Sequence, residues 1–278
     1  MALITASFMS KSLMRTVPVN IIMPTDKLTF PGQPEPSNEP KKLLVLLHGV
    51  FGSYVDWVTG TRVQAFAEAH DLAVVMPSGD NKFYCDSQIS GDRYGTFTGV
   101  ELVDFMRKTF NVSKKREDTY IAGLSMGGFG AIVNGLRHPE TFGCIAGLSS
   151  GLIKQNILSS VDEPGHDIFT RTQYRAIFGL DKIEDYNGSE NDYDALADKV
   201  ASDPNKPKIY LCCGLQDWLL EPNRAYRDKL KGLGYDVTWA ESAGGHTWEF
   251  WSEYIEKVIN WLPLGGSNAG ISSGNVGI

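Results

Sequence analysis

TYIAGLSMGG, residues 119 to 128, is the stretch that decides the fold of this chain. A short apolar run typical of a strand leads directly into the pattern G-x-S-x-G, and a helix is predicted from about residue 127 to 137. A serine on such a strand-to-helix turn sits in strained backbone geometry with its hydroxyl above the sheet. The first N–H groups of the helix favour a developing negative charge nearby. The alternative, a glycine-rich turn with an incidental serine, fits the flanking strand and helix less well. Ser125 is therefore our candidate nucleophile.

A nucleophilic serine needs a base and an acid that orients the base, and after this turn they are expected in the order acid, then histidine. Residues 208–213 form an apolar strand-like run, and Asp217 is the first carboxylate after it. Residues 235–240 form the next predicted strand, and a loop with two glycines then leads to His246. We therefore predict Asp217 as the acid and His246 as the base.

The other candidates fit these two roles less well. Glu221 and Asp236 are better explained as a helix-start carboxylate and a surface strand residue. His246 follows the acid in the expected order and lies on a glycine-hinged loop. Among the other histidines, only His166, in an irregular acidic segment, is a rival. The remaining three are His48 in an earlier motif and His70 and His138 at helix ends.

A second motif predicts an oxyanion hole, the pair of N–H donors that binds the negative oxygen. The continuous apolar run of residues 42–47 is typical of a strand buried on both faces, and it ends in the H-G-x-x-G turn that starts at His48. We expect one donor to be the backbone N–H of Met126, the residue after the serine. The other is expected from Val50, with Phe51 as the alternative. His48 is better explained as a residue that orients the loop than as a base.

Length and composition agree with one enzyme-sized domain. The 278 residues suit a single α/β domain over 1–264 with a small cap insertion at about 151–206 and a flexible tail at 265–278. The net charge of −7 disfavours a nucleic-acid or anionic-membrane partner. Neither a signal peptide nor a membrane-spanning stretch is recognisable, and the four cysteines suit a reduced, cytoplasmic protein. Their spacing indicates no metal site.

The order of predicted elements indicates a doubly wound, mostly parallel sheet with helices on both faces. Residues 5–23 are expected to form an antiparallel edge hairpin, and strands alternate with helices from residue 42 onward. Residues 150–207, irregular, acidic and partly helical, lie where a cap would be inserted. The free edge of the hairpin could pair with a second copy of the chain, so a homo-oligomer is one expectation.

Four stretches of the sequence occur together, namely His48–Ser53 with Asp56 and Trp57, Gly79–Asp86, Gly123–Ala131 and Gly245–Trp248. Taken together, these motifs resemble the putative-esterase (esterase D-like) family of α/β-hydrolases. The resemblance covers roughly residues 5 to 262 and is nearest to tributyrin and acetyl esterases and to carbohydrate esterase family 1. It implies a serine carboxylesterase without a cofactor that hydrolyses short acyl esters, including acetylated saccharides, often as an oligomer.

The substrate is less well defined by the sequence. A set of bulky aromatic residues suggests a tight acyl pocket for acetyl to butyryl groups, although the same rings could instead pack a cap against the sheet. The family resemblance leaves a feruloyl esterase and an S-formylglutathione hydrolase-type thioesterase as alternatives, and an acyltransferase as a further one. The predicted substrate contacts are Phe51, Tyr84, Trp218, Trp248 and Trp251.

Overall fold

The computed structural model describes residues 2–29, 31–32, 35, 37–163 and 165–265. The tail predicted at 265–278 therefore lies outside the described residues except for Gly265. Among the helices of the described residues, none combines the length and the apolar composition that a membrane span requires.

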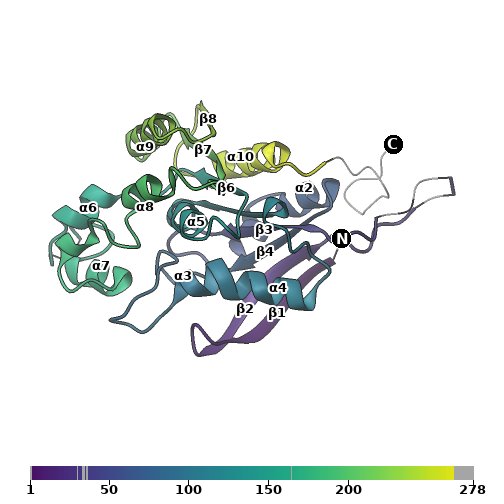
Figure 1. Cartoon of the computed structure of the whole chain (residues 1–278), viewed down its shortest axis with the longest axis horizontal. Helices are drawn as coiled ribbons and strands as arrows, with labels where there is room; N and C mark the ends of the chain where they lie inside the picture. Colours follow the sequence, from purple (N-terminus) through teal and green to yellow (C-terminus); the bar gives the residue numbers. More distant parts are fainter. Residues whose placement is uncertain (1, 30, 33–34, 36, 164, 266–278) are drawn as a thin grey trace.

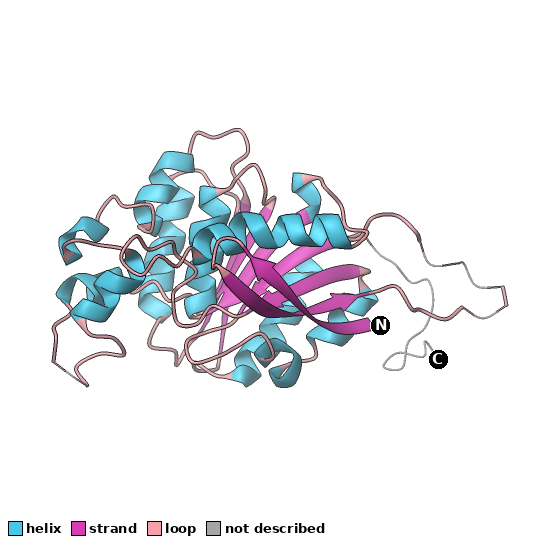
Figure 2. Cartoon of the chain, turned by 90° about the horizontal axis from the view of Figure 1, so that it is seen from below, coloured by secondary structure: helices cyan, strands magenta, loops and turns pink. Residues whose placement is uncertain are grey.

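One eight-stranded sheet organises the molecule (Figure 2). The strand order is β1-β2-β4-β3-β5-β6-β7-β8. β1 is antiparallel to β2 and β2 to β4, whereas all later neighbours are parallel. This confirms the doubly wound, mostly parallel fold and the N-terminal edge hairpin. The strands are β1 (Ala2–Ser10), β2 (Arg15–Met23), β3 (Lys42–Leu47), β4 (Leu72–Pro77), β5 (Thr119–Leu124), β6 (Cys144–Leu148), β7 (Lys208–Gly214) and β8 (Val237–Ser242).

Helices cover both faces of this sheet (Figures 1 and 2). α2 and α10 pack together on one face, and α4, α5 and α9 contribute to the core on the other. A π-helical turn, η1, lies directly between α3 and α4. The helices are α1 (Asp56–Gly60), α2 (Val63–Ala69), α3 (Tyr94–Thr96), η1 (Phe97–Glu101), α4 (Leu102–Thr109), η2 (Arg116–Asp118), α5 (Met126–Arg137), α6 (Lys154–Ser159), α7 (Arg171–Phe178), η3 (Ile183–Tyr186), α8 (Tyr193–Val200), α9 (Leu220–Gly232) and α10 (Trp248–Trp261).

The central strands are apolar on both sides, and this explains their continuous apolar sequences. Along β3, Val45 contributes to one core cluster, and its neighbours Leu44 and Leu46 contribute to the other. Cys212 and Cys213 on β7 divide in the same way between the two faces. Side chains alternate along a strand, so a sheet covered on both faces needs apolar residues at consecutive positions.

The carboxyl ends of the parallel strands bring the chemically important loops together. β3 is followed by the H-G-x-x-G turn, β5 by Ser125, β7 by the loop with Asp217 and β8 by the loop with His246. β5 pairs with β3 on one side and β6 on the other, so the serine leaves the sheet near its middle. In open α/β sheets this edge is where ligands bind.

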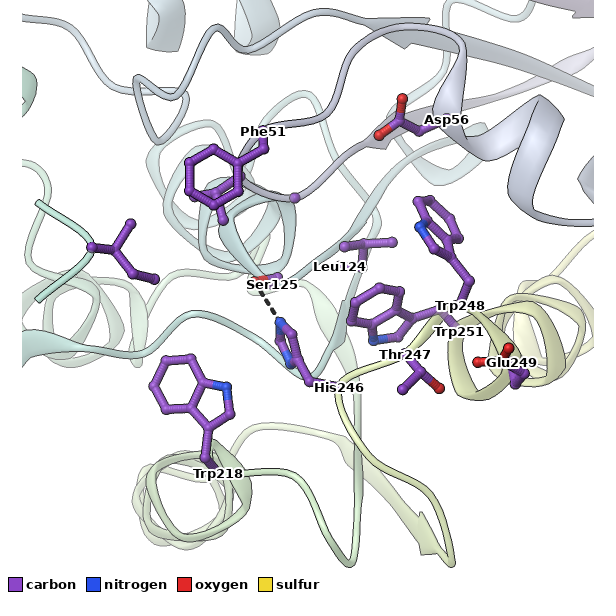
Figure 3. Close-up of a pocket in the computed structure, with 13 residues that line it drawn as sticks. Phe51, Asp56, Leu124, Ser125, Trp218, His246, Thr247, Trp248, Glu249 and Trp251 are labelled. Atoms are coloured by element: carbon purple, nitrogen blue, oxygen red, sulfur yellow. Dashed lines mark hydrogen bonds between the residues drawn. The ribbon is translucent and has the colours of Figure 1, made fainter.

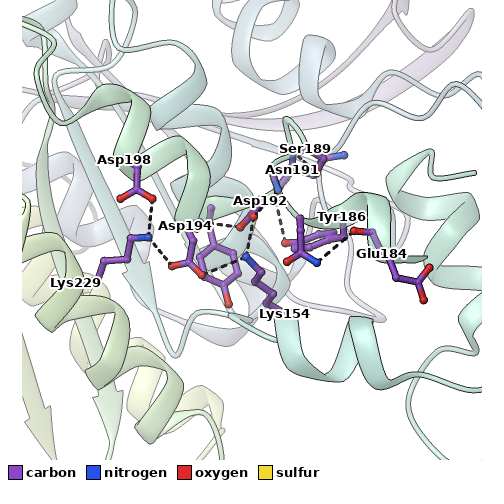
Figure 4. A network of polar contacts seen from close by, with 12 residues as sticks. Lys154, Glu184, Tyr186, Ser189, Asn191, Asp192, Asp194, Asp198 and Lys229 are labelled. Carbon is purple, nitrogen blue, oxygen red and sulfur yellow. Dashed lines mark hydrogen bonds and ion pairs between the residues drawn. The ribbon is translucent and has the colours of Figure 1, made fainter. Parts of the chain in front are cut away.

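The segment between β6 and β7 carries α6, α7, η3 and α8, which gather at one end of the molecule (Figure 1). A polar network ties it to α9 (Figure 4). Lys154 on α6 lies 2.8 Å from Asp192 and 3.6 Å from Asp194, and Lys229 on α9 lies 3.5 Å from Asp194 and 3.0 Å from Asp198. The ion pairs thus join three helices that are far apart in sequence.

Candidate active site

Ser125 lies on the strained turn that the sequence predicted. Its φ is 52° and its ψ is −119°, a conformation that side-chain-bearing residues rarely adopt. The turn depends on close backbone approach at its glycines. A Cβ atom on Gly123 would lie 2.3 Å from the carbonyl oxygen of Gly127, and one on Gly127 would lie 2.3 Å from that of Leu47. Both positions therefore require glycine, and the turn aims the Ser125 hydroxyl into a cavity at the carboxyl edge of the sheet.

Ser125, His246 and Asp217 form one chain of hydrogen bonds. The Nε2 atom of His246 lies 3.0 Å from the Ser125 Oγ, as the dashed line in Figure 3 marks, and its Nδ1 atom lies 2.9 Å from Asp217 Oδ2. A carboxylate only accepts, so Nδ1 must carry a proton that it donates to Asp217. Nε2 is then free to accept the serine proton. This arrangement can activate a hydroxyl as a nucleophile.

Asp217 is held as a carboxylate beneath the imidazole. Its side chain is fully buried, and burial by itself would raise its pKa. Hydrogen bonds to His246, to the Leu219 N–H at 2.9 Å and to the Ser149 hydroxyl oppose this, and the net effect is a pKa below the usual value for aspartate. An ionised Asp217 fixes the ring of His246 and stabilises the imidazolium that proton transfer produces.

The two predicted oxyanion donors flank this serine. Within the part of the chain that the structure describes, the N–H groups of Val50 and Met126 have no hydrogen-bond acceptor. Met126 is the first residue of α5, where an N–H has no partner inside the helix. The N–H of Phe51, the alternative donor, is already bonded to Asn81 Oδ1 at 2.7 Å. The geometry therefore favours Val50 over Phe51.

His48 orients the peptide that carries the Val50 N–H. Its Nε2 atom accepts the Gly79 N–H at 2.9 Å, so the ring proton must be on Nδ1, which lies 2.6 Å from the carbonyl oxygen of Gly49. The Gly49–Val50 peptide bond is trans, so its C=O and N–H point in opposite directions. Because the Gly49 carbonyl points toward His48, the Val50 N–H points away from it. Burial lowers the pKa of His48, which keeps the ring neutral.

A cavity of about 580 Å³ opens above Ser125 and His246. Four of the five predicted substrate contacts line it, namely Phe51, Trp218, Trp248 and Trp251. Phe51 and Trp218 are largely exposed, whereas Trp251 is buried. The ring centroids of Trp251 and His246 lie 4.8 Å apart, with the two ring planes nearly perpendicular. In Figure 3, Trp248 and Trp251 lie on one side of Ser125, and Phe51 and Trp218 lie on the other.

The fifth predicted contact, Tyr84, is elsewhere. Its side chain is fully buried, and its hydroxyl donates to the His48 carbonyl oxygen at 3.0 Å. It lies behind the oxyanion turn and does not line the cavity, because the loop before it turns inward through residues with positive φ, including Phe83 and Tyr84 itself. The expectation that Tyr84 touches substrate is therefore not met.

Sequence reasoning missed several residues at this site. Ile168, Glu249 and Asp56 line the cavity, and none of them was predicted as a substrate contact. Asn81 was not recognised as the acceptor for Phe51. Ile168 lies in a loop without a recognisable motif, but the position of Glu249 beside Trp248 at the start of α10 was a usable signal.

Other chemistry has less support among the described residues. Residues 2–29, 31–32, 35, 37–163 and 165–265 contain no group of three or more histidine, cysteine, aspartate or glutamate residues that could hold a metal ion. All four cysteines are free and buried. Burial raises the pKa of Cys144 to about 11 and that of Cys213 to about 12, so these thiols are poor nucleophiles.

Comparison with known proteins places this geometry in a family. A model of the putative esterase family matches residues 10–261. The chain belongs to this family. An acetyl esterase of Caldicellulosiruptor saccharolyticus is 38% identical over 263 residues, which cover 94% of this chain and 98% of that protein. The esterase is thus a serine hydrolase that acts on carboxylic esters, and its fold is that of the α/β-hydrolases.

Solved structures support the same assignment. FphF, a fluorophosphonate-binding serine hydrolase of Staphylococcus aureus determined with substrate bound, superposes with a TM-score of 0.81 at 29% identity, covering 94% of this esterase and 98% of FphF. An S-formylglutathione hydrolase (FrmB) of Staphylococcus aureus superposes with a TM-score of 0.78, also at 29% identity, with coverages of 94% and 98%. The esterase therefore shares its fold, over almost the whole chain, with both of these hydrolases.

Proposed function

We propose that this esterase hydrolyses short-chain acyl esters, from acetyl to butyryl, through an acyl-enzyme on Ser125. The observation that carries the proposal is the chain of hydrogen bonds from Asp217 through His246 to Ser125, on a turn that leaves the serine exposed to the cavity. The relative named an acetyl esterase supports the acetyl end of this range.

In the proposed reaction, the triad and the oxyanion donors act in both acylation and deacylation. His246 takes the Ser125 proton as Oγ attacks the ester carbonyl, and Asp217 stabilises the resulting imidazolium. The N–H groups of Val50 and Met126 bind the oxyanion, and each such donor is typically worth about 2.7–4 kcal/mol of transition-state stabilisation. His246 then protonates the leaving alcohol, and a water molecule cleaves the acyl-enzyme by the same steps. The reaction as written needs no metal or organic cofactor.

Saccharides fit as the alcohol part of the ester, so acetylated saccharides are candidate substrates under this proposal. The cavity mouth carries exposed aromatic surface on Phe51 and Trp218, which suits the flat faces of sugar rings, and the cavity has room for more than an acetyl group. The same surface favours a feruloyl esterase as a second candidate. A thioesterase of the S-formylglutathione hydrolase type is the third, because one of the similar structures has that activity by name.

Three further assignments belong to the proposal. Residues 151–206 act as a cap, supported by Ile168 of this segment, which lines the cavity. The enzyme works in the cytoplasm, supported by four cysteines that are all free thiols. Two copies associate through the β1 edge, supported by the outer position of that nine-residue strand in the sheet.

Steady-state hydrolysis of p-nitrophenyl acetate, butyrate and octanoate, methyl ferulate and S-formylglutathione tests the proposal. The highest kcat/KM on acetate or butyrate, lost in Ser125→Ala, would support it. A preference for ferulate would favour the second candidate, and a preference for the thioester would favour the third. Equal activity of wild type and Ser125→Ala would rule out all three as written.

A further inference from the structure

Among the described residues, the lining of the cavity above Ser125 includes acidic side chains and no lysine or arginine. Asp56 and Glu249 both line it, and in Figure 3 they lie on the same side of Ser125 as Trp248. Asp217 adds a third carboxylate beneath His246. The lining thus carries negative charge that no neighbouring side chain of the cavity wall neutralises.

Asp56 is fixed with one carboxylate oxygen unused. It is the first residue of α1, and its Oδ1 atom accepts the Ser53 N–H at 3.1 Å and lies 3.3 Å from the Ser53 hydroxyl. Among the described residues, its Oδ2 atom takes part in no hydrogen bond, and the side chain is partly exposed. The bonds at Oδ1 hold the charge in place without neutralising it.

Glu249 supplies the second charge from the first turn of α10, where a carboxylate interacts favourably with the helix dipole. Its side chain is exposed, and a hydrogen bond with Thr247 lowers the pKa of Glu249, so the group is ionised at neutral pH. It reaches the cavity beside Trp248, the residue before it in the chain.

The aromatic lining adds to the effect of these charges. Trp218 is 58% exposed, and Phe51 is 77% exposed at the cavity mouth. The faces of such rings attract cations and give no comparable attraction to anions. The carboxylates and the ring faces therefore both favour a cationic substrate over an anionic one.

We infer that this cavity selects esters by the charge of the alcohol part, favouring cationic over neutral and neutral over anionic alcohols. The inference rests on the proposed function, because an acetyl group fills only a small part of the cavity and the alcohol part then occupies the space near Asp56 and Glu249. It also predicts a barrier against thioesters of anionic thiols, a class that the fold alone leaves open.

Three acetate esters of similar size test this order: acetylcholine, 3,3-dimethylbutyl acetate and 4-acetoxybutanoate, which are cationic, neutral and anionic. We expect kcat/KM to fall in that order, by on the order of tenfold from first to last at low salt. Higher salt should reduce the ratio of kcat/KM between the cationic and the anionic ester, because the screening length falls to about 8 Å at physiological ionic strength. Equal values, or the reverse order, would overturn the inference.

Variants assign the effect to residues. Asp56→Asn keeps an oxygen that can accept from Ser53, and Glu249→Gln keeps the shape of the side chain, so each should reduce the cationic-to-anionic ratio. Glu256→Gln is the matched control, because Glu256 is exposed on the same helix but does not line the cavity. It should leave the ratio unchanged. A ratio that persists in the double variant Asp56→Asn/Glu249→Gln would refute the assignment.

Binding separates this inference from the proposed reaction. The same three esters are titrated into Ser125→Ala by isothermal calorimetry, where no turnover is expected. The cationic ester should bind most tightly and the anionic ester least. If wild type hydrolyses none of the esters, the proposed function fails, but the order of dissociation constants still decides the charge inference. Equal dissociation constants, or no binding of the cationic ester, would contradict it.

Discussion

The Nε2 atom of His48 accepts a hydrogen bond from the backbone N–H of Gly79 at 2.9 Å. A backbone N–H can only donate, so this one bond sets the tautomer of a buried histidine and sends its other proton to the Gly49 carbonyl. Protonation of Nε2 would place two donors against each other. The neutral state of His48 is therefore part of the structure of the oxyanion turn.

Stability should consequently depend on pH through His48. Its pKa in the folded protein is lowered by burial, so its contribution is complete above the unfolded value of about 6.5 and is lost as the pH falls below that value. The difference in free energy of unfolding between wild type and His48→Ala should shrink between about pH 7.5 and about pH 5. Denaturant titrations at several pH values measure this, and a constant difference would contradict the neutral assignment.

Activity should also depend on His48, although this residue does not contact the substrate. Removing the imidazole in His48→Ala frees the Gly49 carbonyl, and the Val50 N–H loses its fixed direction. We expect kcat to fall by up to about 10²-fold, close to the effect of losing an oxyanion donor, with KM little changed. An unchanged kcat in a folded variant would mean that the Val50 N–H is not a donor to the oxyanion.

Asp217 should matter far more for kcat than for binding. Asp217→Asn replaces an acceptor with an amide that can also donate, which favours the wrong tautomer of His246. A loss of kcat on the order of 10³- to 10⁴-fold is expected, as for other serine triads, with a folded protein by circular dichroism. Glu221→Gln is the control, because Glu221 was the rejected candidate, and it should retain activity.

Tyr84 and Trp218 should separate structure from substrate contact. Tyr84→Phe leaves the His48 carbonyl without its donor, so we expect a loss of about 1 kcal/mol in stability and an unchanged KM. Trp218→Ala should leave stability nearly unchanged and raise KM. Substitution of an exposed residue usually changes stability by less than about 0.5 kcal/mol, but here the cavity loses an aromatic side chain from its lining. A raised KM in Tyr84→Phe would restore the original expectation for that residue.

The cap network should contribute to stability through Asp192. This carboxylate is 3% exposed, binds Lys154, caps α8 through the Asp194 N–H and accepts the Gly188 N–H. Asp192→Ala leaves a largely buried lysine without its nearest partner, and we expect a loss of about 2–4 kcal/mol. Asp198→Ala, at an exposed ion pair, should cost no more than about 1 kcal/mol. Equal losses in the two variants would contradict the buried-pair explanation.

The sequence was informative wherever a local pattern had one structural solution. The run into Ser125 predicted β5, the turn and α5, because only glycine tolerates the backbone contacts at positions 123 and 127. Likewise, the apolar run of β3 required a strand covered on both faces. The order of Asp217 and His246 after consecutive strands followed from the parallel sheet.

The sequence was less informative where long-range packing decides. The loop that carries Tyr84 turns inward through four non-glycine residues with positive φ, and no local pattern predicts that conformation; they are Asp80, Asn81, Phe83 and Tyr84. The acidic lining was missed for a related reason. Asp56 and Glu249 come from α1 and α10, which the tertiary fold brings to one cavity from opposite ends of the chain.

The central claim is that Ser125 carries the acyl group during turnover. The most direct measurement is mass spectrometry of the enzyme mixed with p-nitrophenyl acetate and quenched in acid within the first turnovers, followed by peptide mapping. The account predicts an acetyl group on the peptide that contains Ser125 in the wild type and none in Ser125→Ala. Turnover with no acetylated serine, or acetylation at another residue that persists in Ser125→Ala, would contradict it.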